Sequence, residues 1–157
     1  MSAVLNRNIC FIGGGNMAQA LIGGLISRGL PSTRITVSDP VEQVRHLLAE
    51  KDLVVTEDNA SAIREADVVV LAVKPQVLAH VLKPLNGLFD GKLIISIVAG
   101  AEIATIAALA GSDRIVRVMP NTPALVQTGA HGLYATEAVD KEDRDLASQV
   151  LAATGLT

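Results

Sequence analysis

The stretch FIGGGNMAQALIGGL, residues 11–25, decides the fold of this chain. A short apolar run ends at three consecutive glycines, and a helical pattern of small and apolar residues begins at Asn16. Two interpretations fit these residues alone: a glycine-rich turn, or a loop through which the backbone approaches a phosphate. The choice depends on the residues that stand after the other apolar runs of the sequence.

Short apolar runs alternate with helical patterns along most of the chain. We expect strands at 8–12, 34–39, 52–56, 67–73, 92–98, 114–119 and 131–136. We expect helices at 16–28, 41–50, 59–65, 75–88, 102–110 and 141–154. Buried strands alternating with helices of about ten residues are typical of βαβ units. The expected fold class is α/β: a Rossmann-like, doubly wound, mostly parallel sheet with helices on both faces.

Residues with capping or turn preferences stand at the expected helix ends. Asn16, Asp39 and Asn59 stand where helices begin, and Pro75 falls in the first turn of the helix at 75–88. Glycines that favour a left-handed backbone stand beyond helix ends, at Gly29, Gly91 and Gly111.

The composition limits the functions to consider. Half of the 157 residues are apolar but only 2% are aromatic, so the core is expected to be aliphatic, and a net charge of −3 gives no reason to expect nucleic acid. Cys10 is the only cysteine, which favours a reducing, cytoplasmic compartment. The start of the chain lacks the apolar segment of a signal peptide, and Gly100 and Glu102 interrupt the apolar stretch 93–111. We therefore expect neither a leader nor a membrane span.

Ligands of open parallel sheets bind beyond the carboxyl ends of the strands, so those positions carry the functional argument. After the first expected strand comes a G-x-G-x-x-A pattern. In it Gly13 permits the tight turn, Gly15 lets the backbone approach a pyrophosphate, and Ala18 allows close packing of the helix. The next helix points free N–H groups at the phosphates. These features favour a dinucleotide-binding loop formed by Gly13, Gly14, Gly15, Asn16, Met17 and Ala18.

Ser38 and Asp39 end the second expected strand, about 20 residues beyond this loop. A carboxylate there can accept hydrogen bonds from the adenosine ribose of NAD, but either side chain can equally cap the next helix. A 2′-phosphate would favour an arginine, and the nearest one downstream is Arg45. The cofactor is therefore NADP(H) or NAD(H), with the choice open.

Three further strand ends carry polar residues or glycine. Lys74, in Ala72-Val73-Lys74-Pro75, is either a ligand to the cofactor or a solvated lysine before a helix. Gly100, after Ala99, permits close backbone approach. The Asn121-Thr122 pair between Pro120 and Pro123 is either a rigid substrate loop or a stiff turn. The histidines at 46, 80 and 131 form no catalytic group and are interpreted as structural or surface residues, and no cluster has metal-ligand spacing.

Four segments together resemble the amino-terminal domain of pyrroline-5-carboxylate reductases: FIGGGNMAQALIGGL, LAVKPQ, SIVAG and MPNTPALVQTGAHGLYA. The resemblance runs from about Asn8 to the end of the chain, and VRVMPNTPALV is its most specific part. Enzymes of that family reduce the C=N bond of Δ1-pyrroline-5-carboxylate to L-proline with NADPH or NADH, the last step of proline biosynthesis.

The resemblance implies a role for each strand end. Gly13 through Ala18 would hold the pyrophosphate, Ser38 and Asp39 would lie beside the adenosine ribose, and Asn59 would contact the adenosine side. The nicotinamide half would be lined by Ala72, Val73, Lys74, Pro75, Ala99 and Gly100. Asn121 and Thr122, the catalytic candidates, would lie near the nicotinamide and the imine.

The resemblance also implies an organisation. Residues 1–157 would be the dinucleotide-binding domain, and the helical carboxy-terminal domain of the family, which forms a dimer and grips the substrate carboxylate, is expected to be absent from this chain. The whole protein would be a homo-oligomer built on a dimer, and the fragment alone would be inactive. Two other functions stay open: a β-hydroxyacid dehydrogenase or ketopantoate reductase-like enzyme, and a nucleotide-sensing module without catalysis.

Overall fold

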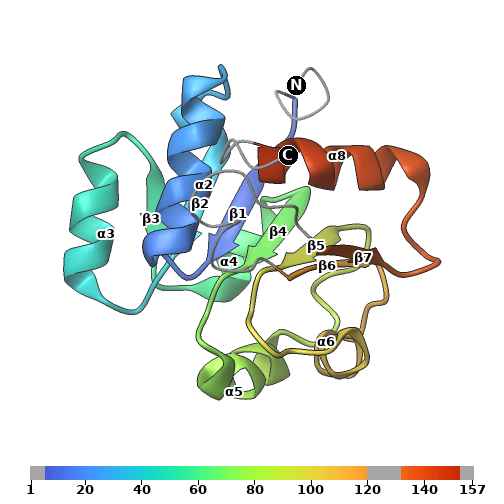
Figure 1. The fold of residues 1–157 in the computed structure, drawn as a ribbon. Helices are drawn as coiled ribbons and strands as arrows, with labels where there is room; N and C mark the ends of the chain where they lie inside the picture. Colours follow the sequence, from blue (N-terminus) through green and yellow to red (C-terminus); the bar gives the residue numbers. More distant parts are fainter. Residues whose placement is uncertain (1–5, 120–131, 153–157) are drawn as a thin grey trace.

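The computed structural model of the chain describes residues 6–119 and 132–152. Within them one seven-stranded sheet has the order β3-β2-β1-β4-β5-β6-β7 (Figure 1). Neighbouring strands from β1 to β6 run parallel, and β7 is antiparallel to β6. This is the doubly wound, mostly parallel fold predicted from the sequence. The strands are β1 (Ile9–Ile12), β2 (Ile35–Ser38), β3 (Val54–Thr56), β4 (Val68–Leu71), β5 (Leu93–Ser96), β6 (Ile115–Met119) and β7 (Gly132–Ala135).

The strand order reverses direction at β1. The chain passes from β1 outward to β2 and β3, and then crosses to the other side of β1 to form β4. Ile12, the last residue of β1, is in register with Ser38 of β2 and with Leu71 of β4. The loops after these three strands therefore leave the sheet side by side, at the switch point where open α/β sheets bind ligands.

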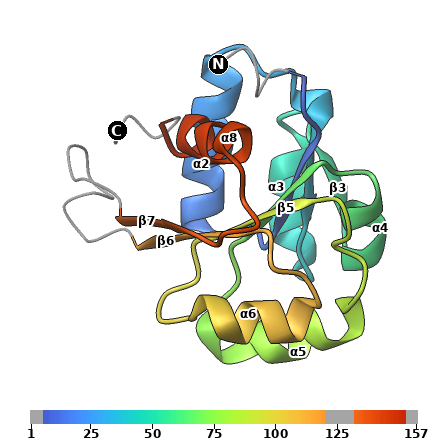
Figure 2. The ribbon, with the colours of Figure 1, turned by 90° about the vertical axis from the view of Figure 1, so that its right-hand side faces the viewer.

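Helices cover both faces of the sheet, as expected (Figure 2). One face packs against α2 (Asn16–Ser27), α3 (Glu42–Ala49) and α8 (Lys141–Ala152). The other packs against α4 (Asn59–Arg64), α5 (Leu78–Leu82) and α6 (Ile103–Ala110). An ion pair between Arg114 and the buried Asp143 ties α8 to the start of β6.

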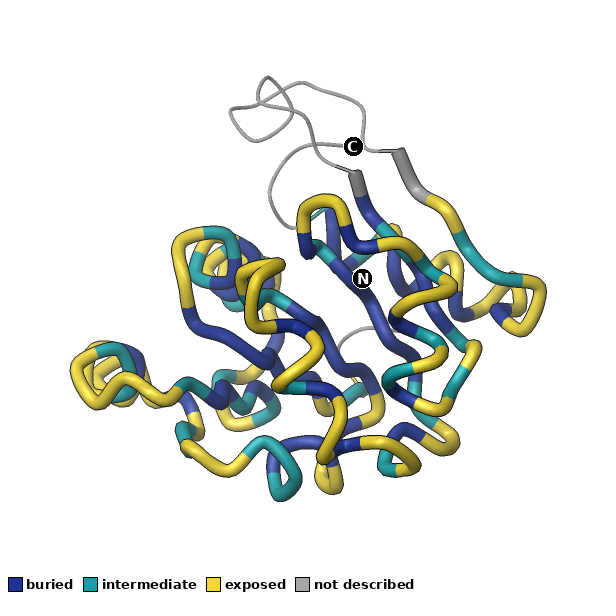
Figure 3. The backbone as a smooth tube through the Cα atoms, turned by 90° about the horizontal axis from the view of Figure 1, so that it is seen from below, coloured by how far each residue is buried: buried dark blue, intermediate teal, exposed yellow. Residues whose placement is uncertain are grey.

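Alternating side chains of each central strand enter the two cores. Ile9 and Phe11 of β1 join the α2 side, whereas Cys10 and Ile12 join the α5 side. The central strands β1, β4 and β5 are buried throughout, while exposed residues lie around them at the periphery of the molecule (Figure 3). The core is largely aliphatic, as expected, but both phenylalanines, Phe11 and Phe89, are also fully buried in it. Burial raises the pKa of the Cys10 thiol to about 12.

The helix expected at 75–88 is broken. Its residues form a 3₁₀ turn η2 (Pro75–Val77), the short helix α5, and a second 3₁₀ turn η3 (Lys83–Leu85). Pro84 explains the second break, because it has no N–H to donate to the carbonyl of His80, one α-helical turn earlier. A further 3₁₀ turn, η1 (Ser32–Arg34), was not expected.

Two of the expected helix caps are wrong by one residue. The N-cap of α2 is Gly15 rather than Asn16, and no side chain caps it. The N-cap of α4 is Asp58, whose carboxylate accepts the N–H groups of residues 60 and 61, rather than Asn59. The expected glycines do have positive φ, at Gly29, Gly91 and Gly111, although Gly91 lies in a turn beyond η3 rather than directly after a helix.

Candidate functional site

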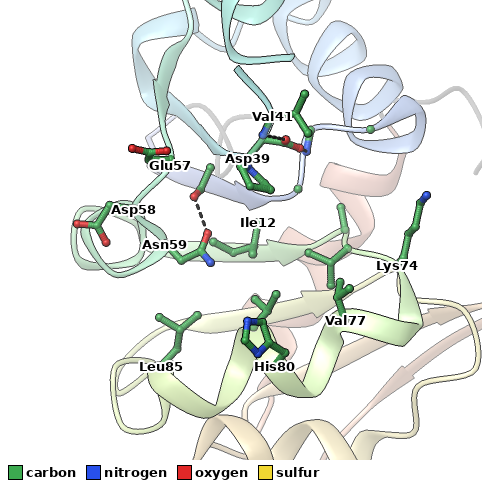
Figure 4. A pocket seen from close by; sticks show the side chains of 18 of the residues that line it. Ile12, Asp39, Val41, Glu57, Asp58, Asn59, Lys74, Val77, His80 and Leu85 are labelled. Atoms are coloured by element: carbon green, nitrogen blue, oxygen red, sulfur yellow. Dashed lines mark hydrogen bonds between the residues drawn. The ribbon is translucent and has the colours of Figure 1, made fainter. Parts of the chain in front are cut away.

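A cavity of ≈ 720 Å³ opens at the switch point of the sheet (Figure 4). One side, which we call the loop wall, consists of residues 13–15, 38–41 and 57–60, from the loops after β1, β2 and β3. The opposite side, the helical wall, consists of Val77, His80, Val81, Pro84 and Leu85. Of the residues expected to bind a cofactor, those in the cavity lining are Gly13, Gly14, Gly15, Ser38, Asp39, Asn59, Ala72, Val73 and Lys74.

The three glycines of the loop wall serve three different purposes. Gly13 has φ +105°, and a Cβ there would lie 2.7 Å from the carbonyl oxygen of Ala72. A Cβ on Gly14 would lie 3.0 Å from side chains of α3 and 3.1 Å from Val37 of β2. A Cβ on Gly15 would meet nothing within 4 Å, and its φ of −76° suits any residue. The space beside Gly15 is therefore not needed by the fold itself.

The amino terminus of α2 is prepared for an anion. The first helical hydrogen bond runs from Gln19 N–H to the Gly15 carbonyl, so the N–H groups of residues 16–18 lie outside the helical ladder. No acidic residue occupies the first turn. Exposed N–H groups and the positive end of a helix dipole together fit a phosphate. Ala18 is buried against the core and packs the helix close to the sheet, the role expected of it.

The Asp39 carboxylate holds the loop wall together. Its Oδ2 accepts the Gly14 N–H at 2.9 Å, and its Oδ1 accepts the Val41 N–H at 2.9 Å. It thereby braces the glycine loop against the turn before α3, but it does not cap that helix, whose N-cap is Val41 and has no side-chain cap. Each carboxylate oxygen can accept a second hydrogen bond, so the side chain, which lines the cavity, can still accept a ribose hydroxyl.

Ser38 and Asn59 form a second polar contact of the loop wall. The Ser38 side chain is buried, and its hydroxyl donates to Oδ1 of Asn59 at 2.5 Å. This contact occupies the amide oxygen and leaves the two N–H donors of the Asn59 side chain for a ligand in the cavity. Ser38 thus orients Asn59, and because Ser38 also lines the cavity, its expected contact with a cofactor stays a prediction.

The sequence interpretation missed the helical wall. Val77, Val81 and Leu85 recur at i, i+4 and i+8, a spacing that also describes an ordinary core-facing helix stripe. Leu78, Leu82 and Leu85 are the core positions of this segment, and Leu85 also lines the cavity together with the other four residues of the helical wall. His80 is exposed, as expected of a surface residue, but it also lines the cavity.

The other expected site residues lie elsewhere. Asn16 and Met17 stand in the first turn of α2, and Pro75 opens η2, beside the cavity lining rather than in it. Ala99 and Gly100 are exposed after β5, and the structure does not bring them to the cavity. Asn121 and Thr122 fall outside the described residues.

Two other classes of site have no support in the part of the chain that the structure describes. No helix there has the length and apolar character needed to cross a membrane. Nor do those residues bring three or more His, Cys, Asp or Glu side chains together as a metal-binding group.

A family model described as NADP oxidoreductase, coenzyme F420-dependent, matches residues 8–100. The chain belongs to this family. A Haemophilus influenzae protein named pyrroline-5-carboxylate reductase is 48% identical over 154 residues, which are 97% of this chain and 57% of that protein. The resemblance to pyrroline-5-carboxylate reductases, inferred from four segments of the sequence, is thus confirmed.

Solved structures agree with this assignment. The pyrroline-5-carboxylate reductase of Coxiella burnetii is 41% identical with a TM-score of 0.88, covering 96% of this chain and 57% of that one. The Plasmodium falciparum pyrroline carboxylate reductase with NADP bound is 28% identical with a TM-score of 0.82, covering 98% and 57%. The chain therefore spans a little over half the length of these relatives.

Proposed function

We propose that this chain is the dinucleotide-binding part of an NAD(P)H-dependent pyrroline-5-carboxylate reductase, which reduces the C=N bond of Δ1-pyrroline-5-carboxylate to L-proline. The names of the relatives support the reaction. One observation in the structure carries the cofactor half of the proposal. Beside Gly15 lies open space that the fold does not need, next to helix N–H groups outside the helical ladder.

The residues of the cavity divide the work of holding a dinucleotide. We assign the pyrophosphate to the backbone of residues 13–18, and the adenosine ribose to Asp39 and Asn59. Val73 and Lys74, after β4, lead toward the nicotinamide, and Pro75, Ala99 and Gly100 keep that assignment on the resemblance alone. When bound, a dihydronicotinamide supplies the hydride, and the protein supplies binding and orientation.

We propose that substrate recognition is divided between this chain and the further length of its relatives. Asn121 and Thr122 keep their proposed place beside the imine on the strength of the MPNTPA segment. We assign the grip on the substrate carboxylate, and dimer-based assembly, to the part of the relatives' length that this chain does not span. A small-molecule substrate and a cytoplasmic location complete the proposal.

The reaction is tested by a substrate comparison on the protein encoded by the whole gene. Dihydronicotinamide absorbance should fall with Δ1-pyrroline-5-carboxylate present, and Asn121→Ala with Thr122→Ala should lower kcat. Turnover of β-hydroxyacids or ketopantoate instead of Δ1-pyrroline-5-carboxylate would show that the proposed substrate is wrong and would favour the dehydrogenase alternative. Binding of NADH without turnover of any of these substrates would favour a nucleotide sensor.

A further inference from the structure

The adenosine end of the cavity is rich in carboxylates. Asp39, Glu57 and Asp58 all line it, whereas Lys74 lies at the other end (Figure 4). Two of the three carboxylates accept hydrogen bonds from backbone N–H groups. Asp39 accepts the N–H groups of Gly14 and Val41, and Asp58 caps α4. Glu57 differs from both of them.

Glu57 is paired with an arginine instead. Its Oε2 lies 3.7 Å from a terminal nitrogen of Arg45, and 73% of its side chain is exposed. The pair joins α3 to the turn after β3, across the loop wall. Because the Glu57 side chain is exposed and makes no backbone cap, we regard it as the carboxylate of this end that can most easily move.

The Arg45 side chain is also held by the backbone of the loop wall. The same terminal nitrogen donates to the Asp39 carbonyl at 2.8 Å, and only 21% of the side chain is exposed. A guanidinium has five N–H donors in a planar fork that suits phosphate oxygens. Its charge therefore lies beside the adenosine end, and Glu57 neutralises it.

NADH and NADPH differ at this end alone, by a 2′-phosphate on the adenosine ribose. A phosphate monoester near three carboxylates is repelled, and an unpaired guanidinium would offset that repulsion. Resting on the proposed function, we propose that the Arg45–Glu57 pair sets the choice between the two dinucleotides. Glu57 withholds Arg45 from a 2′-phosphate, so the pair favours NADH over NADPH.

The test measures the ratio of the dissociation constants of NADH and NADPH for the 157-residue chain, by fluorescence titration. Glu57→Gln should shift this ratio toward NADPH by about three- to fivefold, the size of one exposed charge interaction. Glu65→Gln, an equal charge change at an exposed residue outside the cavity lining, should leave the ratio unchanged. In an Arg45→Met background, Glu57→Gln should produce less than half of the shift.

Each other outcome overturns the inference in a distinguishable way. An unchanged ratio in Glu57→Gln, or an equal shift in Glu65→Gln, would remove Glu57 from cofactor choice. An undiminished shift in the Arg45→Met background would show direct repulsion by Glu57 and no role for Arg45. If wild-type chain bound neither dinucleotide, the proposed function itself would fall, and this inference with it.

Discussion

The two walls of the cavity are built by different means. The loop wall is held by hydrogen bonds between successive loops: Gly13 N–H to the Ser38 carbonyl at 2.8 Å, and Asp39 N–H to the Thr56 carbonyl at 3.0 Å. The Asp39 carboxylate adds the contact to Gly14. The helical wall is mostly apolar. Val77 comes from the 3₁₀ turn η2, Val81 and the exposed His80 from the short helix α5, and Pro84 and Leu85 from the 3₁₀ turn η3.

This difference indicates what each wall contributes to binding. Hydrogen bonds within the loop wall fix the positions of its N–H groups before any ligand arrives, which lowers the ordering cost of binding. The helical wall offers apolar surface to a flat ring, and burial of that surface depends little on the orientation of the ring. Changes in the loop wall should therefore affect stability, specificity or both, whereas truncation in the helical wall should weaken affinity only slightly.

The largest effect is expected for Gly13→Ala. The new Cβ would overlap the Ala72 carbonyl at 2.7 Å, on a backbone whose φ of +105° disfavours any side chain. Together these should lower the free energy of unfolding by roughly 2–5 kcal/mol. Urea unfolding followed by circular dichroism measures this loss. A stability equal to that of wild type would mean that Gly13, after β1, does not lie as close to the Ala72 carbonyl, after β4, as the structure shows.

Asp39→Asn should come next, because it breaks the brace of the loop wall. An amide is neutral and retains one acceptor oxygen, so one of the Gly14 and Val41 N–H groups loses its acceptor and the other keeps only an uncharged one. The expected loss in unfolding free energy is about 1.5–3 kcal/mol, and binding should shift toward NADPH as a negative charge disappears. A shift in the cofactor ratio at unchanged stability would instead identify Asp39 as a ribose ligand without a bracing role.

Gly15→Val separates binding from folding in the same loop. Nothing lies within 4 Å of the new Cβ, so unfolding should lose no more than the roughly 1 kcal/mol of a poorer N-cap. Dinucleotide affinity should fall at least tenfold, about 1.4 kcal/mol, because the side chain occupies the space of the pyrophosphate. Calorimetric titration with NADH measures this.

Gly23→Val is the matched control for that prediction. Gly23 lies in α2, the helix whose N-cap is Gly15; it is exposed and has equally open surroundings, but it does not line the cavity. Its affinity for NADH should equal that of wild type. If Gly15→Val also bound with wild-type affinity, the pyrophosphate would not lie beside Gly15.

The sequence predicted the sheet well because the central strands are buried aliphatic runs between helix signals. Strands such as Val68–Leu71 and Leu93–Ser96 have that pattern on both faces. The broken helix after β4 was missed because apolar periodicity outweighed Pro84 in the interpretation, although its missing N–H breaks the helix. The direction of β7 could not be predicted, because strand direction depends on the path of the connection and not on the strand residues.

The site was predictable only at the ends of strands. Gly13, Asp39 and Lys74 were found because the carboxyl ends of parallel strands meet at one edge. The helical wall was not, because its residues share the spacing of a core stripe. The bracing by Asp39 and the Arg45–Glu57 pair depend on where separate loops meet, which spacing along the chain does not encode.

The titration of Cys10 tests whether the core beneath the helical wall excludes solvent. The thiol shares a core cluster with Leu78 and Leu82, and burial raises its pKa from 9.0 to about 12. Between these values the unfolded chain releases a proton that the folded chain keeps. The free energy of unfolding should therefore be insensitive to this group below pH 9.0 and fall above it, by about 1.4 kcal/mol per pH unit.

Cys10→Ala supplies the comparison. The difference in unfolding free energy between wild type and variant should stay constant up to about pH 8.5 and then shrink as the pH rises. Urea unfolding at both ends of that range measures it, and titration of other groups cancels in the difference. A constant difference up to about pH 10.5 would show that solvent reaches the thiol, so that the helical wall rests on an open core.

The smallest effect is expected for Val81→Ala in the helical wall. Val81 is only partly buried, so the substitution removes apolar contact with a ligand and leaves few unfilled core contacts. NADH affinity should fall about threefold, less than the full value of two buried methylene groups. Val54→Ala, at a half-exposed position on edge strand β3 outside the cavity, is the matched control and should bind as wild type does. A loss of NADH affinity of tenfold or more in Val81→Ala would contradict the difference between the two walls. It would mean that the helical wall also positions the ligand rather than merely covering it.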